Sequence, residues 1–359
     1  MKPIKKYVEN FFANRRVLGS DPTLNVLPKT DMLLGNLVRQ KKVPGLSITV
    51  LKDGKTLFEK GYGYSDIQSG TPVNFTKTKF RIASVSKPIA ATALAYMVAD
   101  GIIDLDASFY TYVPYYPKKK WDFTIRQLAS HTAGIRCYKG MEYGLNHPYT
   151  IKESIRIFKD DDLIFEPGGG YLYYSFDWVL ISLAMQEASG IPFDEIVRQK
   201  VLVPIGMKNT RAPSVTERDE HTTNLATFYT KNRLGFRTAI QVNNHYKLAG
   251  GGYLSTSADI AKLGQWYLEE AALPKEIRSQ FLTSKIVKGK PTFYGLGWQV
   301  SEDSMGRKYF GHIGNGVGGY SNFFIYPDKQ MVFAILINCT DPKVQSNLDE
   351  MIGWLLDDI

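Results

Sequence analysis

Residues 80–87 read FRIASVSK, a short apolar piece followed by Ser84 and, three residues later, Lys87. The next residues, 88–103, predict an amphipathic helix. Positions i and i+3 share one face of a helix, so we expect Ser84 Oγ and the Lys87 ammonium group to meet. A helix N-terminus adds free N–H groups and the positive end of the helix dipole. A hydroxyl, a neighbouring base and N–H donors form the arrangement of an activated nucleophile. The same sequence pattern also arises when the serine only caps the helix and the lysine lies on the surface.

Strands are expected on both sides of this segment. The upstream stretch 46–66, LSITVLKDGKTLFEKGYGYSD, has β-branched and alternating apolar residues on each side of Asp53-Gly54, which is a strong hairpin signal. Downstream, strands are predicted over residues 307–312, 320–326 and 331–338. Helical spacing of apolar residues predicts further helices over residues 30–42, 176–189, 257–271 and 342–357.

Because strands lie near both ends and helices lie between them, we expect an α/β (α+β) fold with one antiparallel sheet assembled from both chain ends. Residues 1–28 are expected to form an N-terminal extension and residues 29–359 a single domain. Within that domain, an α/β lobe is expected over about 29–83 plus 291–359, and an inserted, mostly helical lobe over about 84–290.

The composition is that of a globular protein: 359 residues, 44% hydrophobic and 22% charged, with a net charge of +9. Apart from Lys118-Lys119-Lys120 the basic residues are mixed with acidic ones. We therefore expect no nucleic-acid partner and only a weak attraction to anionic surfaces. No apolar stretch approaches the roughly 18 residues of a membrane span. The five histidines form no ligand pair and CxxC is absent, so neither a metal nor another cofactor is expected.

The two cysteines, Cys137 and Cys339, allow at most one disulfide and do not identify a redox compartment. The first twenty residues contain basic side chains but lack the apolar region of a signal peptide. As written, the chain is expected in the cytoplasm, or in the periplasm or outside the cell if a leader has been trimmed. The compartment and the oligomeric state stay open.

Two further segments change the interpretation of FRIASVSK. Residues 166–175 read EPGGGYLYYS and precede a predicted helix, and residues 311–315 read GHIGN. Together the three segments resemble the S-x-x-K, Y-x-N or Y-x-S, and K-T-G or H-x-G motifs of the serine β-lactamase and penicillin-binding-protein superfamily. The chain resembles the class C β-lactamase-related branch from about residue 30 to residue 359. Stretches such as SHTAGIRCY are especially similar to the mitochondrial serine β-lactamase-like subgroup.

This resemblance implies a β-lactamase/transpeptidase-like fold, with an antiparallel sheet of about five strands flanked by the N- and C-terminal helices. It also implies that Ser84 is the nucleophile, that Lys87 helps to deprotonate it, and that Tyr173 moves the proton to the leaving group. A free tyrosine titrates near pH 10, so Tyr173 acts as a base only if a cation such as Lys87 lowers its pKa. Which of the two is the general base stays open at this point.

The third motif departs from the family pattern. His312 replaces the usual lysine and is expected to orient the tyrosine or the substrate, with activity falling as the pH drops through about 6–7. Ile313 replaces threonine, and we expect it to form an apolar wall that favours uncharged substrates, unless another cation such as Lys247 or Arg136 folds over the cleft and binds a carboxylate. The backbone N–H groups of Ser84 and Asn315 match the oxyanion-hole donors, with Gly314 beside them. Ser175 stands where many relatives have asparagine.

The leading hypothesis is a metal-independent serine hydrolase that acts through an acyl-enzyme on a small-molecule or peptide substrate, at an amide, peptide or ester bond. One alternative is a true β-lactamase or D-Ala-D-Ala carboxypeptidase, and another is a weakly active homologue with an interaction or scaffold role. His131 and Asp177 are expected to be a packing residue and a helix-start residue.

Overall fold

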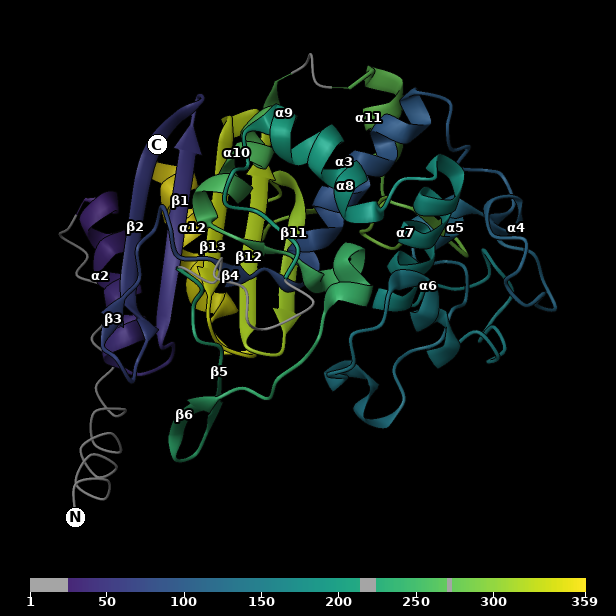
Figure 1. The fold of residues 1–359 in the computed structure, drawn as a ribbon. Helices are drawn as coiled ribbons and strands as arrows, with labels where there is room; N and C mark the ends of the chain where they lie inside the picture. Colours follow the sequence, from purple (N-terminus) through teal and green to yellow (C-terminus); the bar gives the residue numbers. More distant parts are fainter. Residues whose placement is uncertain (1–24, 214–223, 270–272) are drawn as a thin grey trace.

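The computed structural model describes residues 25–213, 224–269 and 273–359. A seven-stranded antiparallel sheet forms one side of the molecule, in the order β10-β11-β12-β13-β1-β2-β3 (Figure 1). Its strands are β1 (Gly45–Lys52), β2 (Lys55–Asp66), β3 (Thr71–Pro72), β10 (Gln299–Glu302), β11 (Lys308–Gly316), β12 (Gly319–Tyr326) and β13 (Met331–Ile337). The predicted α/β class and antiparallel sheet are confirmed.

The two ends of the chain meet at the centre of this sheet. β1 pairs with β13, with Leu46 opposite Ile337, and it pairs with β2 on its other side. The turn between β1 and β2 contains Asp53 and Gly54 at φ values of 50° and 74°. A short turn with two positive φ values matches the right-handed twist of paired strands, which explains why Asp-Gly closes this hairpin.

The sheet is covered on both faces. The N-terminal helix α2 (Val26–Arg39) and the C-terminal helix α12 (Gln345–Asp358) pack together on one face, where they share an apolar core with alternate residues of the strands. Helix α10 (Ser257–Leu268) packs on the opposite face, against β1 and β13. The main helical lobe lies beside this second face, as the teal and blue helices of Figure 1 show.

The inserted lobe is built around two helices that are buried on nearly all sides, α3 (Ser86–Ala99) and α7 (Ser175–Ser189). α3 is therefore a core helix, not the amphipathic one that the sequence predicted. The other helices of the lobe are α4 (Phe109–Tyr112), α5 (Ile125–Ala129), α6 (Ile151–Ser154), α8 (Phe193–Val197), α9 (Val203–Ile205) and α11 (Lys275–Phe281). Three small strand pairs lie outside the large sheet: β4 (Phe80–Arg81) with β7 (Leu254–Ser255), β5 (Tyr229–Asn232) with β6 (Gly235–Thr238), and β8 (Ile286–Val287) with β9 (Lys290–Pro291).

Two details differ from the sequence prediction. Helix α2 begins at Val26, four residues before the expected start, because Pro28 lies in the first turn, where a helix does not need its missing N–H. The expected extension 1–28 therefore overlaps this helix, and residues 1–24 lie outside the described chain. The sheet has seven strands instead of about five because the short edge strands β3 and β10 add to the five central ones. None of the helices in the described chain is long and apolar enough to cross a membrane.

Candidate active site

Ser84 lies in a single 3₁₀ turn, Ala83–Val85, which leads directly into α3. The preceding residue, Ala83, has φ at 44°, a left-handed conformation that is costly for a residue with a side chain. Strand β11 holds the turn on one side through two glycines. A Cβ at Gly314 would lie 3.1 Å from the Ser84 nitrogen, and one at Gly316 would lie 3.2 Å from Ala83 Cβ. Gly314 needs glycine, because a Cβ there would also overlap the Ile82 carbonyl oxygen and Ser321 Oγ, whereas a Cβ at Gly316 would make only a tight contact with Ala83.

Lys87 is fully buried one turn further along, and its Nζ atom has three hydrogen-bond acceptors. It lies 3.1 Å from Ser84 Oγ, 2.8 Å from the Tyr173 hydroxyl and 2.7 Å from the Gly250 carbonyl oxygen. Gly250 reaches this position because it packs directly on the first residue of α7: a Cβ at Gly250 would lie 3.1 Å from Ser175 Cβ. The structure thus brings Tyr173, which lies 86 positions after Lys87 in the sequence, next to the neighbouring pair Ser84 and Lys87.

Burial shifts the pKa values of Lys87 and Tyr173 in opposite directions. Burial lowers the pKa of Lys87 to about 7, and the positive charge of Lys247 adds to this shift, which only a negative charge on Asp177 would oppose. Burial also raises the pKa of Tyr173 above its ordinary value, although a hydrogen bond with Ser84 opposes the change. Near neutral pH the lysine is therefore partly deprotonated, whereas the tyrosine keeps its proton.

A cleft of about 310 Å³ opens beside Ser84. Aromatic rings, backbone glycines and one cation line it: Ala83, Ser84, Tyr138, Tyr143, Tyr174, Ser175, Asn244, Lys247, Gly250, Gly251, Asn315, Gly316, Val317 and Thr340. Ser84, Ser175 and Asn315 are thus on the cleft wall, as expected for groups that contact substrate. Asn315 is held there because its amide oxygen accepts the N–H of Asp341 at 3.2 Å.

Ile313 does not form a wall of this cleft, and that prediction is wrong. Its side chain packs into the apolar core between the sheet and the terminal helices α2 and α12. Neighbouring residues of a strand point to opposite faces, so His312 and Gly314 face the lobe that carries Ser84 whereas Ile313 faces away. The expected preference for uncharged substrates therefore loses its basis.

His312 faces the site but is buried behind it, with 1% of its surface exposed. Its Nδ1 lies 2.6 Å from the Ile313 carbonyl oxygen and therefore carries the proton, so Nε2 accepts the Tyr294 hydroxyl at 3.0 Å. Burial, together with the charge of Lys87, lowers the pKa of His312 to about 3. His312 therefore stays neutral between pH 5 and 8, and the expected loss of activity through its titration at pH 6–7 loses its basis. The group with a pKa near 7 is Lys87.

A buried histidine–aspartate pair lies behind Tyr173, where the sequence predicted only packing and a helix start. His131 Nδ1 lies 2.7 Å from Asp177 Oδ2, and the His131 ring lies 4.6 Å from the Tyr173 ring, centroid to centroid. Burial raises the pKa of Asp177 and lowers the pKa of His131. The Tyr174 N–H also donates to Nδ1 at 3.3 Å, so we assign a neutral pair in which the Asp177 carboxyl group donates to Nδ1.

Comparison with known proteins agrees with this geometry. The Beta-lactamase family profile matches residues 30–355. The chain belongs to the β-lactamase family, and this membership makes it a serine hydrolase. It is 26% identical to the mitochondrial serine beta-lactamase-like protein LACTB of Homo sapiens, over 83% of this chain and 71% of the relative.

Two solved structures have the same fold. The octameric penicillin-binding protein homologue from Pyrococcus abyssi superposes with a TM-score of 0.80 at 24% identity, over 92% of this chain and 77% of its own. The D-amino acid amidase from Ochrobactrum anthropi SV3, in complex with D-phenylalanine, also gives a TM-score of 0.80, at 20% identity, over 93% and 99% of the two chains. The predicted relationship to the β-lactamase and penicillin-binding-protein superfamily is confirmed.

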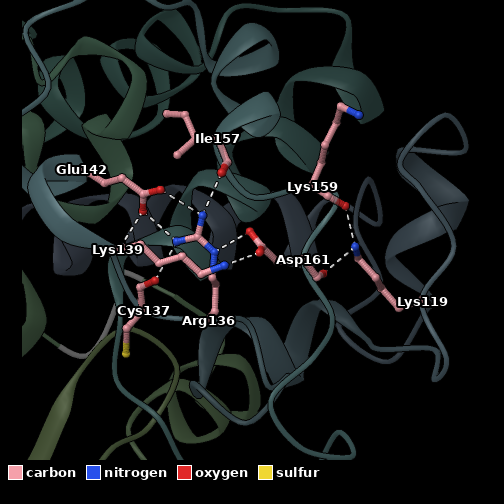
Figure 2. Close-up of polar contacts among 8 residues, drawn as sticks. All are labelled: Lys119, Arg136, Cys137, Lys139, Glu142, Ile157, Lys159 and Asp161. Atoms are coloured by element: carbon pink, nitrogen blue, oxygen red, sulfur yellow. Dashed lines mark hydrogen bonds and ion pairs between the residues drawn. The ribbon is translucent and has the colours of Figure 1, made fainter.

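In this β-lactamase-family chain, Arg136 holds the loop that carries Tyr138 and Tyr143, two residues of the cleft wall. Figure 2 shows the polar contacts of Arg136. The Arg136 guanidinium group donates to Glu142 at 2.7 and 3.0 Å and to Asp161 at 2.5 Å, and it also donates to the carbonyl oxygens of Cys137 and Ile157, each at 2.7 Å. All five N–H groups are therefore used within the fold. Arg136 fixes the loop that presents Tyr138 and Tyr143 to the cleft, and its own charge is neutralised by two carboxylates.

Proposed function

We propose that this protein hydrolyses an amide, peptide or ester bond through an acyl-enzyme on Ser84, with Lys87 as the general base and Tyr173 as a neutral proton carrier. The observation that carries the proposal is the position of the fully buried Lys87, whose Nζ lies between the hydroxyl groups of Ser84 and Tyr173. A lysine with its pKa near 7 is matched to proton transfer at neutral pH.

Acylation follows from these contacts. The neutral Lys87 amine takes the proton of Ser84, and Oγ attacks the substrate carbonyl carbon. The backbone N–H groups of Ser84 and Asn315, on the cleft wall, stabilise the negative oxygen that forms. Tyr173 gives its proton to the leaving amine or alcohol and recovers one from the Lys87 ammonium group. The site then holds an ester of Ser84, a neutral Tyr173 and a neutral Lys87.

Deacylation reverses the proton path. A water molecule takes the place of the leaving group, and its proton passes through Tyr173 to Lys87 as its oxygen attacks the ester carbonyl. Collapse of the intermediate returns a proton to Ser84 and releases the acid. Nothing in this path uses a metal, and the described residues contain no group of three or more His, Cys, Asp and Glu suited to a metal ion.

The choice of amide, peptide or ester substrates is supported by the relatives' own names, since one structural relative is a D-amino acid amidase. β-Lactam hydrolysis is the second candidate, favoured by one observation: Lys247 lines the cleft and could meet the carboxylate that β-lactam substrates carry. The third, a weakly active scaffold, is disfavoured by the complete set of hydrogen bonds on Lys87.

The test is covalent labelling with a fluorophosphonate and, separately, with a fluorescent penicillin, each in wild type and in Ser84→Ala. The proposal expects fluorophosphonate labelling that disappears in Ser84→Ala. Rapid turnover of the penicillin would favour the β-lactamase alternative, and no Ser84-dependent labelling by either probe would favour the scaffold alternative.

A further inference from the structure

Lys247 is the cationic side chain on the wall of the cleft that contains Ser84. It ends a 3₁₀ turn, His245–Lys247, and only 8% of its surface is exposed. Its Nζ atom donates to the Tyr143 carbonyl oxygen at 3.0 Å and lies 5.3 Å from the centre of the Tyr138 ring. The cleft wall thus contains a desolvated ammonium group, that of Lys247, beside aromatic residues.

This charge has no counterion on the cleft wall. None of the cleft-lining residues is Asp or Glu, and none of the ion pairs formed within the described chain includes Lys247. Arg136 is the contrasting case nearby, because Glu142 and Asp161 neutralise it. An ammonium group has three donors, and a buried one needs a negative or strongly polar partner to offset its lost hydration.

Lys247 nevertheless keeps its charge near neutral pH. Burial, and after it the charge of Arg81, lower its pKa to about 8. At pH 7 the ammonium form therefore predominates. A buried, charged donor that faces an open cleft without a counterion is arranged to receive an anion from the ligand.

We propose that Lys247 forms an anion subsite, and that the preferred substrate carries a carboxylate close to the bond that Ser84 attacks. This rests on the proposed hydrolase function and adds the class of substrate: acidic amides, peptides or esters. It reverses the preference for uncharged substrates that Ile313 suggested, because Ile313 lies on the other face of the sheet and Lys247 lies in the cleft.

The carboxylate could belong to the acyl part of the substrate or to its leaving group, and two matched pairs separate these sources. N-acetyl-glutamyl and N-acetyl-glutaminyl p-nitroanilides, each in D and L form, differ only on the acyl side. N-acetyl-alanyl p-aminobenzoate and N-acetyl-alanyl p-aminobenzamide differ only on the leaving side. The readout is the ratio of kcat/KM for the acidic and the neutral member of each pair.

In wild type the acidic member of one pair should be preferred. In Lys247→Met that ratio should fall about 10–100-fold, mainly through KM, which is the scale of a hydrogen bond to a charged group. Lys247→Arg should retain the preference. Lys152→Met is the matched control, because Lys152 is an exposed lysine of the neighbouring helix α6, outside the cleft, and its removal should leave the ratio unchanged. Any effect of Lys247 on the pKa of Lys87 acts on both members of a pair and cancels in the ratio.

Binding tests the subsite without catalysis. Calorimetry on Ser84→Ala should show tighter binding of the acidic than of the neutral compound of the same pair, and Lys247→Met should remove that difference. Equal binding of both members in both pairs, or a preference that survives Lys247→Met, overturns the subsite. An acidic preference in binding without Ser84-dependent labelling would refute the hydrolase and leave the subsite standing.

Discussion

Lys87 Nζ lies 2.8 Å from the Tyr173 hydroxyl, and burial shifts the pKa values of these two groups in opposite directions. The lysine becomes easier to deprotonate and the tyrosine becomes harder to deprotonate, because burial disfavours the charged form of each. These opposite shifts support the proposed assignment of Lys87 as the general base and of Tyr173 as a carrier that gives and recovers one proton.

Removing either Lys87 or Tyr173 should strongly lower the rate of hydrolysis. Lys87→Ala and Tyr173→Phe should each lower kcat by about 10²–10⁴-fold, the usual scale for a positioned acid or base. The double variant should be little worse than either single one, since the two groups act on the same proton path. Steady-state kinetics on a p-nitrophenyl ester measures this. Near-normal turnover by Tyr173→Phe would show that the leaving group is protonated without the tyrosine.

The two lysines of the site should be coupled. The charge of Lys247 contributes to the low pKa of Lys87, so Lys247→Met should raise that pKa and move the rise in kcat/KM to higher pH. The buried His131–Asp177 pair and His312 stay neutral in this range, because burial raises the pKa of Asp177 and lowers the pKa values of both histidines. A pH profile between 5 and 9 measures the midpoint, with Lys152→Met as control. An unchanged or lower midpoint in Lys247→Met would contradict the coupling.

Ile313→Thr should affect stability and not selectivity. The side chain packs between the sheet and the terminal helices, so placing a hydroxyl there should lower the free energy of unfolding by about 1 kcal/mol. Denaturant unfolding measures the loss, and the acidic-to-neutral ratio of kcat/KM should stay at its wild-type value. A changed ratio would mean that residue 313 reaches the substrate after all.

The neutral His131–Asp177 pair makes a separate prediction about stability. Asp177→Asn keeps a donor for His131 Nδ1 and should be tolerated within about 1 kcal/mol. Asp177→Ala removes the 2.7 Å hydrogen bond and leaves the buried Nδ1 only the longer one from the Tyr174 N–H, so it should cost about 1–3 kcal/mol. Thermal and denaturant unfolding compare the two variants. If Asn were as damaging as Ala, the pair would have to be ionic, because Asn supplies the hydrogen bond but not the charge.

The parts of this site that depend on local geometry were predictable from the sequence. Ser84 and Lys87 meet because a helix brings positions i and i+3 together, and the β1–β2 hairpin follows from Asp53-Gly54. The direction of the Ile313 side chain could also have been predicted. Ile313 follows His312 on one strand, so their side chains point to opposite faces of the sheet.

The remaining features depend on contacts between distant segments. His131 and Asp177 are 46 positions apart, and each has an ordinary local interpretation, so only the packing of α7 against the loop after α5 shows that they pair. Lys247 likewise gives no local signal. It reaches the cleft because the glycine-rich segment after it packs against Ser175, and a single sequence does not reveal that approach.

The most direct test of the central claim, that Lys87 activates Ser84, is the second-order rate of fluorophosphonate labelling between pH 5 and 9, with the labelled peptide identified by mass spectrometry. The account predicts a label on Ser84 and a rate that rises once, with a midpoint near pH 7, as Lys87 loses its proton. In Lys87→Ala the rise should disappear and the rate should stay low throughout. A label on another residue, or a Lys87→Ala profile that matches wild type, would contradict the claim.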